Sequence, residues 1–374
     1  MPEPAPLHPV RREHLDAISD ATGIFQHATG SRPDPRHGYC TDDVARALVV
    51  DLLHARELGW PAVEASAERG VRFLAEAFES STGLFRNFRR ADRSWVEAPA
   101  SEWIEAPASE DAHARALLAL GESIAGLPGG PLLERAGELF ERAFPAAVEL
   151  AYIRPRAAVL LACEAADRGG LGVTRGGYRE LADALLGAFE SPGLSEAWPW
   201  PEALVTYENG LPAQALIVTG LAFDRPEMVG VGLRVLDWLV EHQTAPGGHL
   251  APVGNRGWWR RGGVPARYDQ QPIEATSLLL AAAAGYYATG SRRYQEVMEM
   301  AYAWYLGAND GGVRVAVPER GASHDGLTPA GVNGNQGAES TLMWLIALEE
   351  IRRQRRSASR PLYEPVAIGV EGKR

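Results

Sequence analysis

Helical periodicity of two alternating kinds is the feature of this sequence that most constrains its fold. Apolar residues recur at spacings of three and four, as at Val63, Ala67, Val71, Leu74 and Phe78, whereas sustained strand alternation is hard to find. The pattern predicts an all-α protein with about twelve helices, near residues 9–20, 41–57, 61–79, 110–125, 131–148, 155–168, 176–190, 210–223, 226–242, 271–288, 291–306 and 337–354.

The second, fourth, sixth and later even-numbered helices of this series are rich in Ala and Leu on most faces, as in ALLALGESIAG. Such a composition suits a helix that is packed on all sides, whereas the intervening helices carry charges on one face and suit an outer layer. Short turns lead from inner to outer helices, and long loops at 80–109, 191–209, 243–270 and 307–336 lead back. We therefore expect a single (α/α)6 toroid domain over residues 1–374, with a short flexible N-terminus and a C-terminal tail after about 355.

The charge balance and the cysteines narrow the functional classes. The chain has 48 acidic and 37 basic residues and a net charge of −11, which argues against nucleic acid as a partner. No apolar run has the length of a signal peptide core or approaches the roughly 18 residues of a membrane span. With only Cys40 and Cys163, we expect a cytoplasmic protein that binds no membrane. The oligomeric state stays open.

Groups of polar residues stand where the inner helices are expected to begin. Because these helix starts meet at one end of a toroid, we expect the side chains to line one pocket. The groups are Thr41-Asp42-Asp43, Ser109-Glu110-Asp111, Asn209 to Gln214, Asp269-Gln270-Gln271 with Glu274, and Asn335-Gln336 with Glu339.

Each acidic group alone is explained by helix capping, because a Ser or Thr cap followed by acids stabilises a helix start by about 0.3 to 1 kcal/mol. Several such groups at the same end of the toroid are more than helix capping requires. Carboxylates in a cleft can divide into a protonated acid and an ionised base, the division that glycosidic-bond cleavage requires. We predict Glu274 as the acid and Asp43 or Asp111 as the base, with Asp42 and Glu110 as further catalytic candidates. A structural hydrogen-bonding role would also fit Glu274.

Candidate substrate-binding residues come from the loops and the helix starts. Trp198, Trp200 and Trp258 lie in long loops, like Trp95, Trp103 and Trp259, where aromatic faces could stack on sugar rings or simply anchor the loops. Arg86 and Arg261 could bind an anionic group or pair with the acids of the pocket. The other candidates are His37, Tyr39, His113, Glu202, Tyr207, Asn209, Asp269, Gln270, Gln271, Asn335, Gln336 and Glu339.

Signatures of other chemistries are absent. The sequence contains no Walker A loop, no GxSxG elbow and no HExxH motif, and its histidines are too scattered to spell a metal site. We expect neither a cofactor nor a metal.

Several motifs together resemble a bacterial family of six-hairpin, glycosidase-like proteins that are often described only in relation to glycosyltransferases. They are HGYCTDDVARAL, SEDAHARALLALG, GWWRRGG, DQQPIEA and NGNQGAESTLMWLIALE, and the resemblance extends from about His37 to Glu350. It implies an (α/α)6 toroid acting on a glycan, with a mannose-containing one as the first candidate. The segment EAPASE departs from the family pattern, because it occurs twice, at 97–102 and 105–110.

Four hypotheses for the function follow. We favour a glycoside hydrolase, inverting, that cleaves an oligosaccharide. A sugar epimerase on the same scaffold would use His113, His249 or His324 as proton carriers. A phosphorylase would require inorganic phosphate, and a non-catalytic glycan-binding module would serve as an accessory to a glycosyltransferase. The fold alone does not choose among them.

Overall fold

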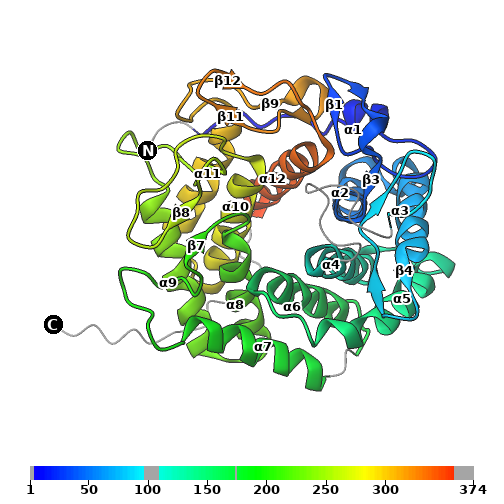
Figure 1. Cartoon of the computed structure of the whole chain (residues 1–374), viewed down its shortest axis with the longest axis horizontal. Coiled ribbons are helices and arrows are strands. Elements are labelled where there is room, and N and C mark those ends of the chain that lie inside the picture. The colour runs from blue at the N-terminus through cyan, green and yellow to red at the C-terminus, as the bar shows by residue number, and fades with distance from the viewer. Residues whose placement is uncertain (1–3, 97–108, 173–174, 358–374) are drawn as a thin grey trace.

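The structure, a computed structural model, describes residues 4–96, 109–172 and 175–357, and it is an all-α toroid (Figure 1). Within these residues the inner helices are α2 (Thr41–Leu58), α4 (Glu110–Gly126), α6 (Ile153–Arg168), α8 (Gly210–Ala222), α10 (Pro272–Thr289) and α12 (Ala338–Ser357). The outer helices are α3 (Glu64–Ala77), α5 (Pro131–Ala147), α7 (Arg175–Phe189), α9 (Pro226–His242) and α11 (Arg292–Tyr305).

The inner helices form a closed ring. Each packs against the next inner helix along the chain, and α12 returns to pack against α2. Each of α3, α5, α7, α9 and α11 packs on the inner helix that precedes it. The predicted (α/α)6 architecture is therefore confirmed. The duplicated EAPASE segment and Trp103 lie outside the described residues, apart from Ser109 and Glu110.

The first predicted helix, 9–20, is wrong in its extent. Only α1 (Glu13–Ala17) is helical, and it packs against α12. The chain turns away after Ile18 because Asp20 accepts hydrogen bonds from the backbone N–H groups of Thr22 (2.7 Å) and Gly23 (3.1 Å). This short-range bonding by an aspartate competes with helix continuation.

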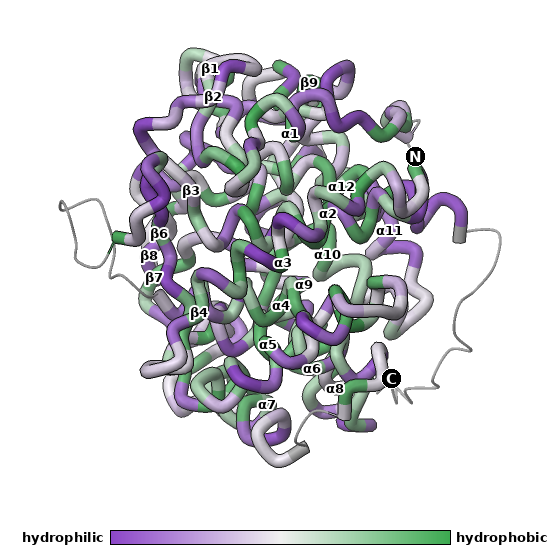
Figure 2. Tube along the Cα trace, turned by 90° about the vertical axis from the view of Figure 1, so that its right-hand side faces the viewer, coloured by the Kyte–Doolittle hydropathy of each residue, from purple (hydrophilic) through white to green (hydrophobic). Residues whose placement is uncertain are grey.

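Burial distinguishes the two kinds of helix as expected. The inner helix α10 buries 14 of its 18 residues, whereas the outer helix α3 buries 6 of 14. Hydrophilic and hydrophobic residues accordingly alternate along the outer helices in Figure 2. Where inner helices cross, small residues permit close approach: a Cβ at Gly121 would lie 2.4 Å from the carbonyl oxygen of Ala162, and one at Gly210 would lie 2.2 Å from that of Ser277.

Short antiparallel strand pairs tie the loops together. Among the described residues they are β1 (Ala28–Thr29) with β2 (Arg32–Pro33), β3 (Tyr39–Cys40) with β6 (Phe88–Arg89), β4 (Phe78–Glu79) with β5 (Leu84–Phe85), β7 (Leu204–Val205) with β8 (Trp259–Arg260), β9 (Ala316–Val317) with β10 (Ala322–Ser323), and β11 (Leu327–Thr328) with β12 (Gly331–Val332). The pairs β3–β6 and β7–β8 join loops distant in sequence, and Figure 2 shows them along the same side of the molecule. This side carries the starts of the inner helices. None of the described helices is long and apolar enough to cross a membrane.

Gly121→Ala should lower the free energy of unfolding by about 1 to 3 kcal/mol, because the added methyl group would overlap the backbone of α6 at Ala162. Gly137→Ala, on the outer helix α5, is the matched control. A Cβ at Gly137 meets no atom within 4 Å, and alanine favours a helix interior by up to about 1 kcal/mol. Urea unfolding of both variants measures the difference, and equal effects would contradict the close packing of the inner ring.

Candidate active site

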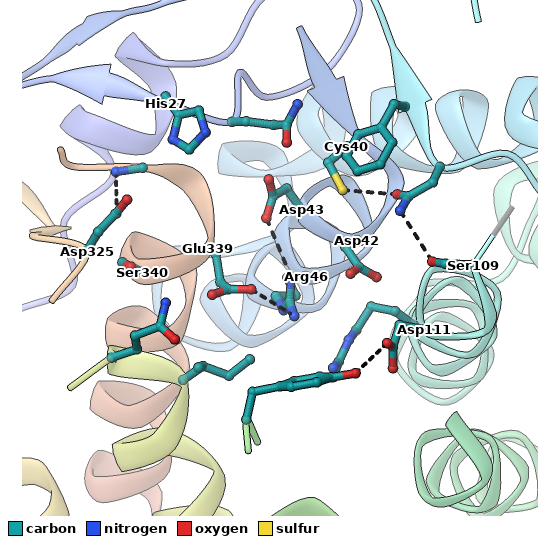
Figure 3. Close-up of a pocket in the computed structure, with 18 residues that line it drawn as sticks. His27, Cys40, Asp42, Asp43, Arg46, Ser109, Asp111, Asp325, Glu339 and Ser340 are labelled. Atoms are coloured by element: carbon teal, nitrogen blue, oxygen red, sulfur yellow. Dashed lines mark hydrogen bonds and ion pairs between the residues drawn. The ribbon is translucent and has the colours of Figure 1, made fainter. Parts of the chain in front are cut away.

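A cavity of about 360 Å³ opens where α2, α4, α10 and α12 begin (Figure 3). We call it the central cavity. Part of its described lining comes from the starts of these helices: Asp42, Asp43, Arg46, Ser109, Asp111, Arg115, Gln271, Ile273, Gly337, Glu339 and Ser340. The rest comes from the segments between helices: Gln26, His27, Cys40, Asn87, Phe88, Tyr207 and Asp325. The expectation that these helix starts share one pocket is thus met by four of the inner helices.

Arg46 lies among the carboxylates of the central cavity. Its guanidinium is 3.5 Å from Asp43 and 3.3 Å from Glu339, and its side chain is 5% exposed. Burial raises the pKa of Asp43 well above its ordinary value, and the charge of Arg46 opposes the rise. The pKa of Glu339 is raised for the same reasons, although its side chain, at 38% exposure, faces the open space. Arg46 therefore engages two of the acids.

Asp111 is a lining acid that accepts a hydrogen bond from a neutral side chain. The hydroxyl of Tyr207 donates to Asp111 Oδ2 at 2.6 Å. Burial raises the pKa of Asp111, the hydrogen bond from Tyr207 opposes that rise, and the nearby charge of Asp42 adds to it. A carboxyl group in such a setting retains its proton at a higher pH than an exposed aspartate, so Asp111 can act as a proton donor.

Asp42 is the neighbouring acid with free hydrogen-bonding capacity. Its side chain is partly exposed, and its Oδ1 atom has no hydrogen-bond partner among the described residues. Figure 3 shows Asp42 between Arg46 and Asp111. This Oδ1 atom is itself buried, and it is the exposed part of the side chain that borders the cavity.

Glu274, our predicted acid, is not among the residues that line the central cavity. It is buried, and it accepts the backbone N–H of Glu208 at 2.6 Å and the side-chain amide of Asn209 at 2.9 Å. Burial raises the pKa of Glu274 to about 8, against the opposing effect of the backbone N–H groups of Glu208 and Asn209. Its carboxylate faces the loop before α8 rather than the cavity, which is the structural role left open at the sequence level.

The loop that Glu274 holds delivers two side chains to the site. Glu208 has a φ of 50°, a left-handed conformation that is strained for a residue with a side chain. With the backbone fixed this way, Glu208 pairs with Arg115 and Tyr207 reaches Asp111. Arg154 supports the same loop by donating to the carbonyl oxygen of Tyr207 and to Asn209 Oδ1.

Glu110, another catalytic candidate, also points elsewhere. Its carboxylate accepts the backbone N–H groups of Ala151 and Tyr152 at 3.0 and 3.1 Å, which fixes the turn before α6. The adjacent positions Glu110 and Asp111 thus face in different directions, because successive residues on a helix are separated by about 100°.

Five of the predicted binding residues border a cavity. Tyr207, Gln271 and Glu339 line the central cavity, and His37 and Asn335 line a smaller one beside it. The others lie outside both linings: Tyr39, Arg86, His113, Trp198, Trp200, Glu202, Asn209, Trp258, Arg261, Asp269, Gln270 and Gln336.

Most of those outlying residues fix loops. Arg86 donates to the carbonyl oxygen of Glu76 at 2.6 Å, and the hydroxyl of Tyr39 donates to Asp20 at 2.6 Å. The side chain of Gln270 is fully buried between Trp304, which donates to it, and Asp310, which accepts from it. Further such contacts join Glu202 to Arg154, Arg261 to the carbonyl oxygen of Trp200, and the carbonyl oxygen of Gln336 to His14.

The sequence left open whether the loop tryptophans stack on sugars or anchor the loops, and Trp198, Trp200 and Trp259 do not expose their faces. All three are buried, and Trp198 packs against both Trp238 and Trp259. Their indole N–H groups donate to backbone carbonyl oxygens of the same loops, so they anchor the loops. These three residues therefore fit the interpretation that they anchor the loops.

Several lining residues were missed at the sequence level. Arg46 follows Asp43 by three residues and could have been found from helical spacing. His27 and Asp325 lie in loops without any pattern that places them at the site. In contrast, His113, His249 and His324, the proton carriers proposed for an epimerase, do not line the central cavity. No group of three or more potential metal-ligating side chains is found within the described part of the chain.

No family description and no curated protein matches this sequence. Solved structures similar to it include a cellobiose 2-epimerase from Spirochaeta thermophila, with a TM-score of 0.66 and 15% identity over 92% of this chain and 93% of that one. A D-mannose isomerase has a TM-score of 0.67 and 12% identity over 92% and 96% of the two chains. A GH76 α-mannanase from Bacteroides thetaiotaomicron has a TM-score of 0.63 and 9% identity over 93% of this chain and 96% of that one.

The chain shares their fold. Because the structures cover nearly the whole length of one another, the likeness extends over the complete toroid rather than over a few helix pairs. At these identities the likeness establishes the (α/α)6 architecture, and the function of the toroid has to be argued from its own cavity.

Glu274→Gln should lower the free energy of unfolding by about 1 to 3 kcal/mol, because an amide cannot accept the N–H groups of both Glu208 and Asn209 and leaves a buried donor unpaired. Glu241→Gln on the exposed surface of α9 is the control. Chemical unfolding of both variants measures the change. Full stability of the Glu274 variant with complete loss of activity would instead assign Glu274 to the chemistry.

Proposed function

We propose that the protein is a glycoside hydrolase that cleaves an uncharged oligosaccharide in the central cavity. The observation that carries the proposal is the presence of two acids in different settings in one cavity: Asp111, which accepts a hydrogen bond from Tyr207, and Asp42, whose side chain is partly exposed. They stand at the starts of neighbouring inner helices. Glycosidic-bond cleavage needs a proton donor on one side of the bond and a base on the other.

In this proposal Asp111 protonates the leaving glycosidic oxygen and Asp42 accepts a proton from the attacking water. Arg46 contacts Asp43 and Glu339, and in this proposal these two acids shape the cavity and bind hydroxyl groups. A volume of about 360 Å³ leaves room for a water molecule beside a sugar ring. We propose an inverting reaction, in which the base acts through water.

The charges of the lining favour hydrolysis over phosphorolysis. Arg46 and Arg115 are the arginines of the described lining, and both are paired with carboxylates. Inorganic phosphate would have to displace Glu339 or Glu208 and would meet the charges of Asp42 and its neighbours. We therefore expect activity without phosphate.

Epimerisation is the second candidate, because His27 lines the central cavity and two of the similar structures are a cellobiose 2-epimerase and a D-mannose isomerase. The side-chain amide of Asn335 lies 2.7 Å from His27 Nδ1, while its oxygen accepts the backbone N–H of Ala28. This orientation makes Nδ1 an acceptor and places the ring hydrogen on Nε2. His27 then presents a hydrogen-bond donor to the cavity. In this form it does not provide a base that could abstract a proton from a sugar C–H group.

Two further proposals concern the sugar in the substrate and the cellular compartment. A mannose-containing glycan is the first substrate to try, since an α-mannanase is among the similar structures. We place the protein in the cytoplasm, because Cys40 and Cys163 are both free and buried.

Asp111→Asn and Asp42→Asn should each lower kcat by a factor of roughly 100 or more while leaving the protein folded, because each removes one proton carrier. The measurement is product analysis by chromatography after incubation with neutral oligosaccharides, with and without phosphate. Asp92→Asn, on an exposed turn, is the control. Full hydrolysis by both site variants would refute the assignment, isomerised products would establish the epimerase, and binding without turnover would leave a glycan-binding module.

Tyr207→Phe should move the alkaline limb of the kcat/KM profile to higher pH. The hydroxyl of Tyr207 stabilises ionised Asp111, so its removal raises the pKa of Asp111 further and the proton stays on to higher pH. The stacking of Arg154 over the ring, 4.7 Å from its centre, does not need the hydroxyl. An alkaline limb that stays in place would show that Asp111 is not the acid.

A further inference from the structure

A second cavity, of about 300 Å³, adjoins the central one and is more open to solvent. We call it the outer cavity. It lies between the β1–β2 hairpin with the following short helix at Pro35–His37 and the segment before α12. Its lining is His27, Ala28, Thr29, Asp34, His37 and Asn335. His27 belongs to both linings, and Figure 3 shows it on the side of the central cavity away from Asp111.

Two imidazole rings form the wall of the outer cavity. The rings of His27 and His37 are 4.4 Å apart at an angle of 80°. His27 is held by the amide of Asn335, and the side chain of His37 is 51% exposed. Flat rings with N–H groups at their edges suit a sugar, because the ring faces pack against C–H groups and the nitrogen atoms bond hydroxyl groups.

The carboxylate in the lining of the outer cavity, that of Asp34, is already paired. The guanidinium of Arg36 donates to both oxygens of Asp34, at 2.8 and 2.6 Å, and holds the pKa of that carboxyl well below its usual range. Burial lowers the pKa of His27, as does the proximity of His37, so the ring of His27 is neutral at neutral pH. A lining whose carboxylate is already paired with Arg36 suits an uncharged polyhydroxyl unit rather than an anion or a cation.

We infer that the outer cavity is a second sugar-binding site, so that the substrate is an uncharged glycan of at least two units that extends from the central cavity past His27. The inference rests on the proposed function, since the bond that reacts lies in the central cavity. It adds a specificity determinant that the acids do not supply. A single sugar unit would leave the surfaces of His37 and Asn335 unused.

Calorimetric titration with two pairs of sugars tests the inference: α-1,6-mannobiose against mannose, and cellobiose against glucose. The disaccharide of at least one pair should bind about tenfold more tightly than its monosaccharide, the gain expected for one or two additional hydrogen bonds. In His37→Ala this ratio of Kd values should approach one. Arg32→Ala, on the same hairpin but outside the lining, should keep the wild-type ratio.

Equal Kd values within both pairs of sugars, or an unchanged ratio in His37→Ala, would overturn the second site. Release of reducing sugar from the disaccharides reports separately on the proposed function. Tighter disaccharide binding without hydrolysis would support the outer site and contradict the hydrolase. Hydrolysis without the gain in affinity would support the hydrolase and contradict the outer site. Failure of all four sugars to bind or react would contradict both proposals.

Discussion

The ion pairs of Arg46 join the two ends of the ring at the place where the central cavity forms. Arg46 belongs to α2, the first inner helix, and Glu339 belongs to α12, the last. A buried guanidinium is costly without anionic partners, so its burial depends on α12 returning to α2. The same contacts position Asp43 and Glu339 around the cavity. Closure of the ring and assembly of the acidic site are therefore one structural event.

The loop before α8 shows how buried polar groups away from the cavity set its geometry. Glu274 accepts the backbone N–H of Glu208 and the side-chain amide of Asn209. Arg154 donates to the carbonyl oxygen of Tyr207 and to Asn209 Oδ1. These contacts hold the left-handed conformation of Glu208, whose backbone would otherwise relax. The cavity thus receives Tyr207, and Arg115 in its lining receives a carboxylate partner, from a loop whose polar support is buried.

The helical periodicity predicted the ring, and the polar helix starts predicted where its cavity lies, because both patterns are local and repeat along the chain. The directions in which individual side chains point were less predictable. Glu274 and Glu110 stand in the same kind of motif as Asp111, yet they bind loops because the neighbouring turns offer them N–H groups. His27 comes from a loop and reaches the site only through tertiary contacts, which local sequence patterns do not encode.

A crystal structure of Asp111→Asn, soaked with the oligosaccharides that the wild-type protein binds, tests the central claim most directly. The account predicts a sugar ring in the central cavity, with a hydroxyl or a water molecule bound to Asp42 and the glycosidic oxygen facing position 111. A sugar bound elsewhere on the toroid, with the central cavity empty, would contradict it.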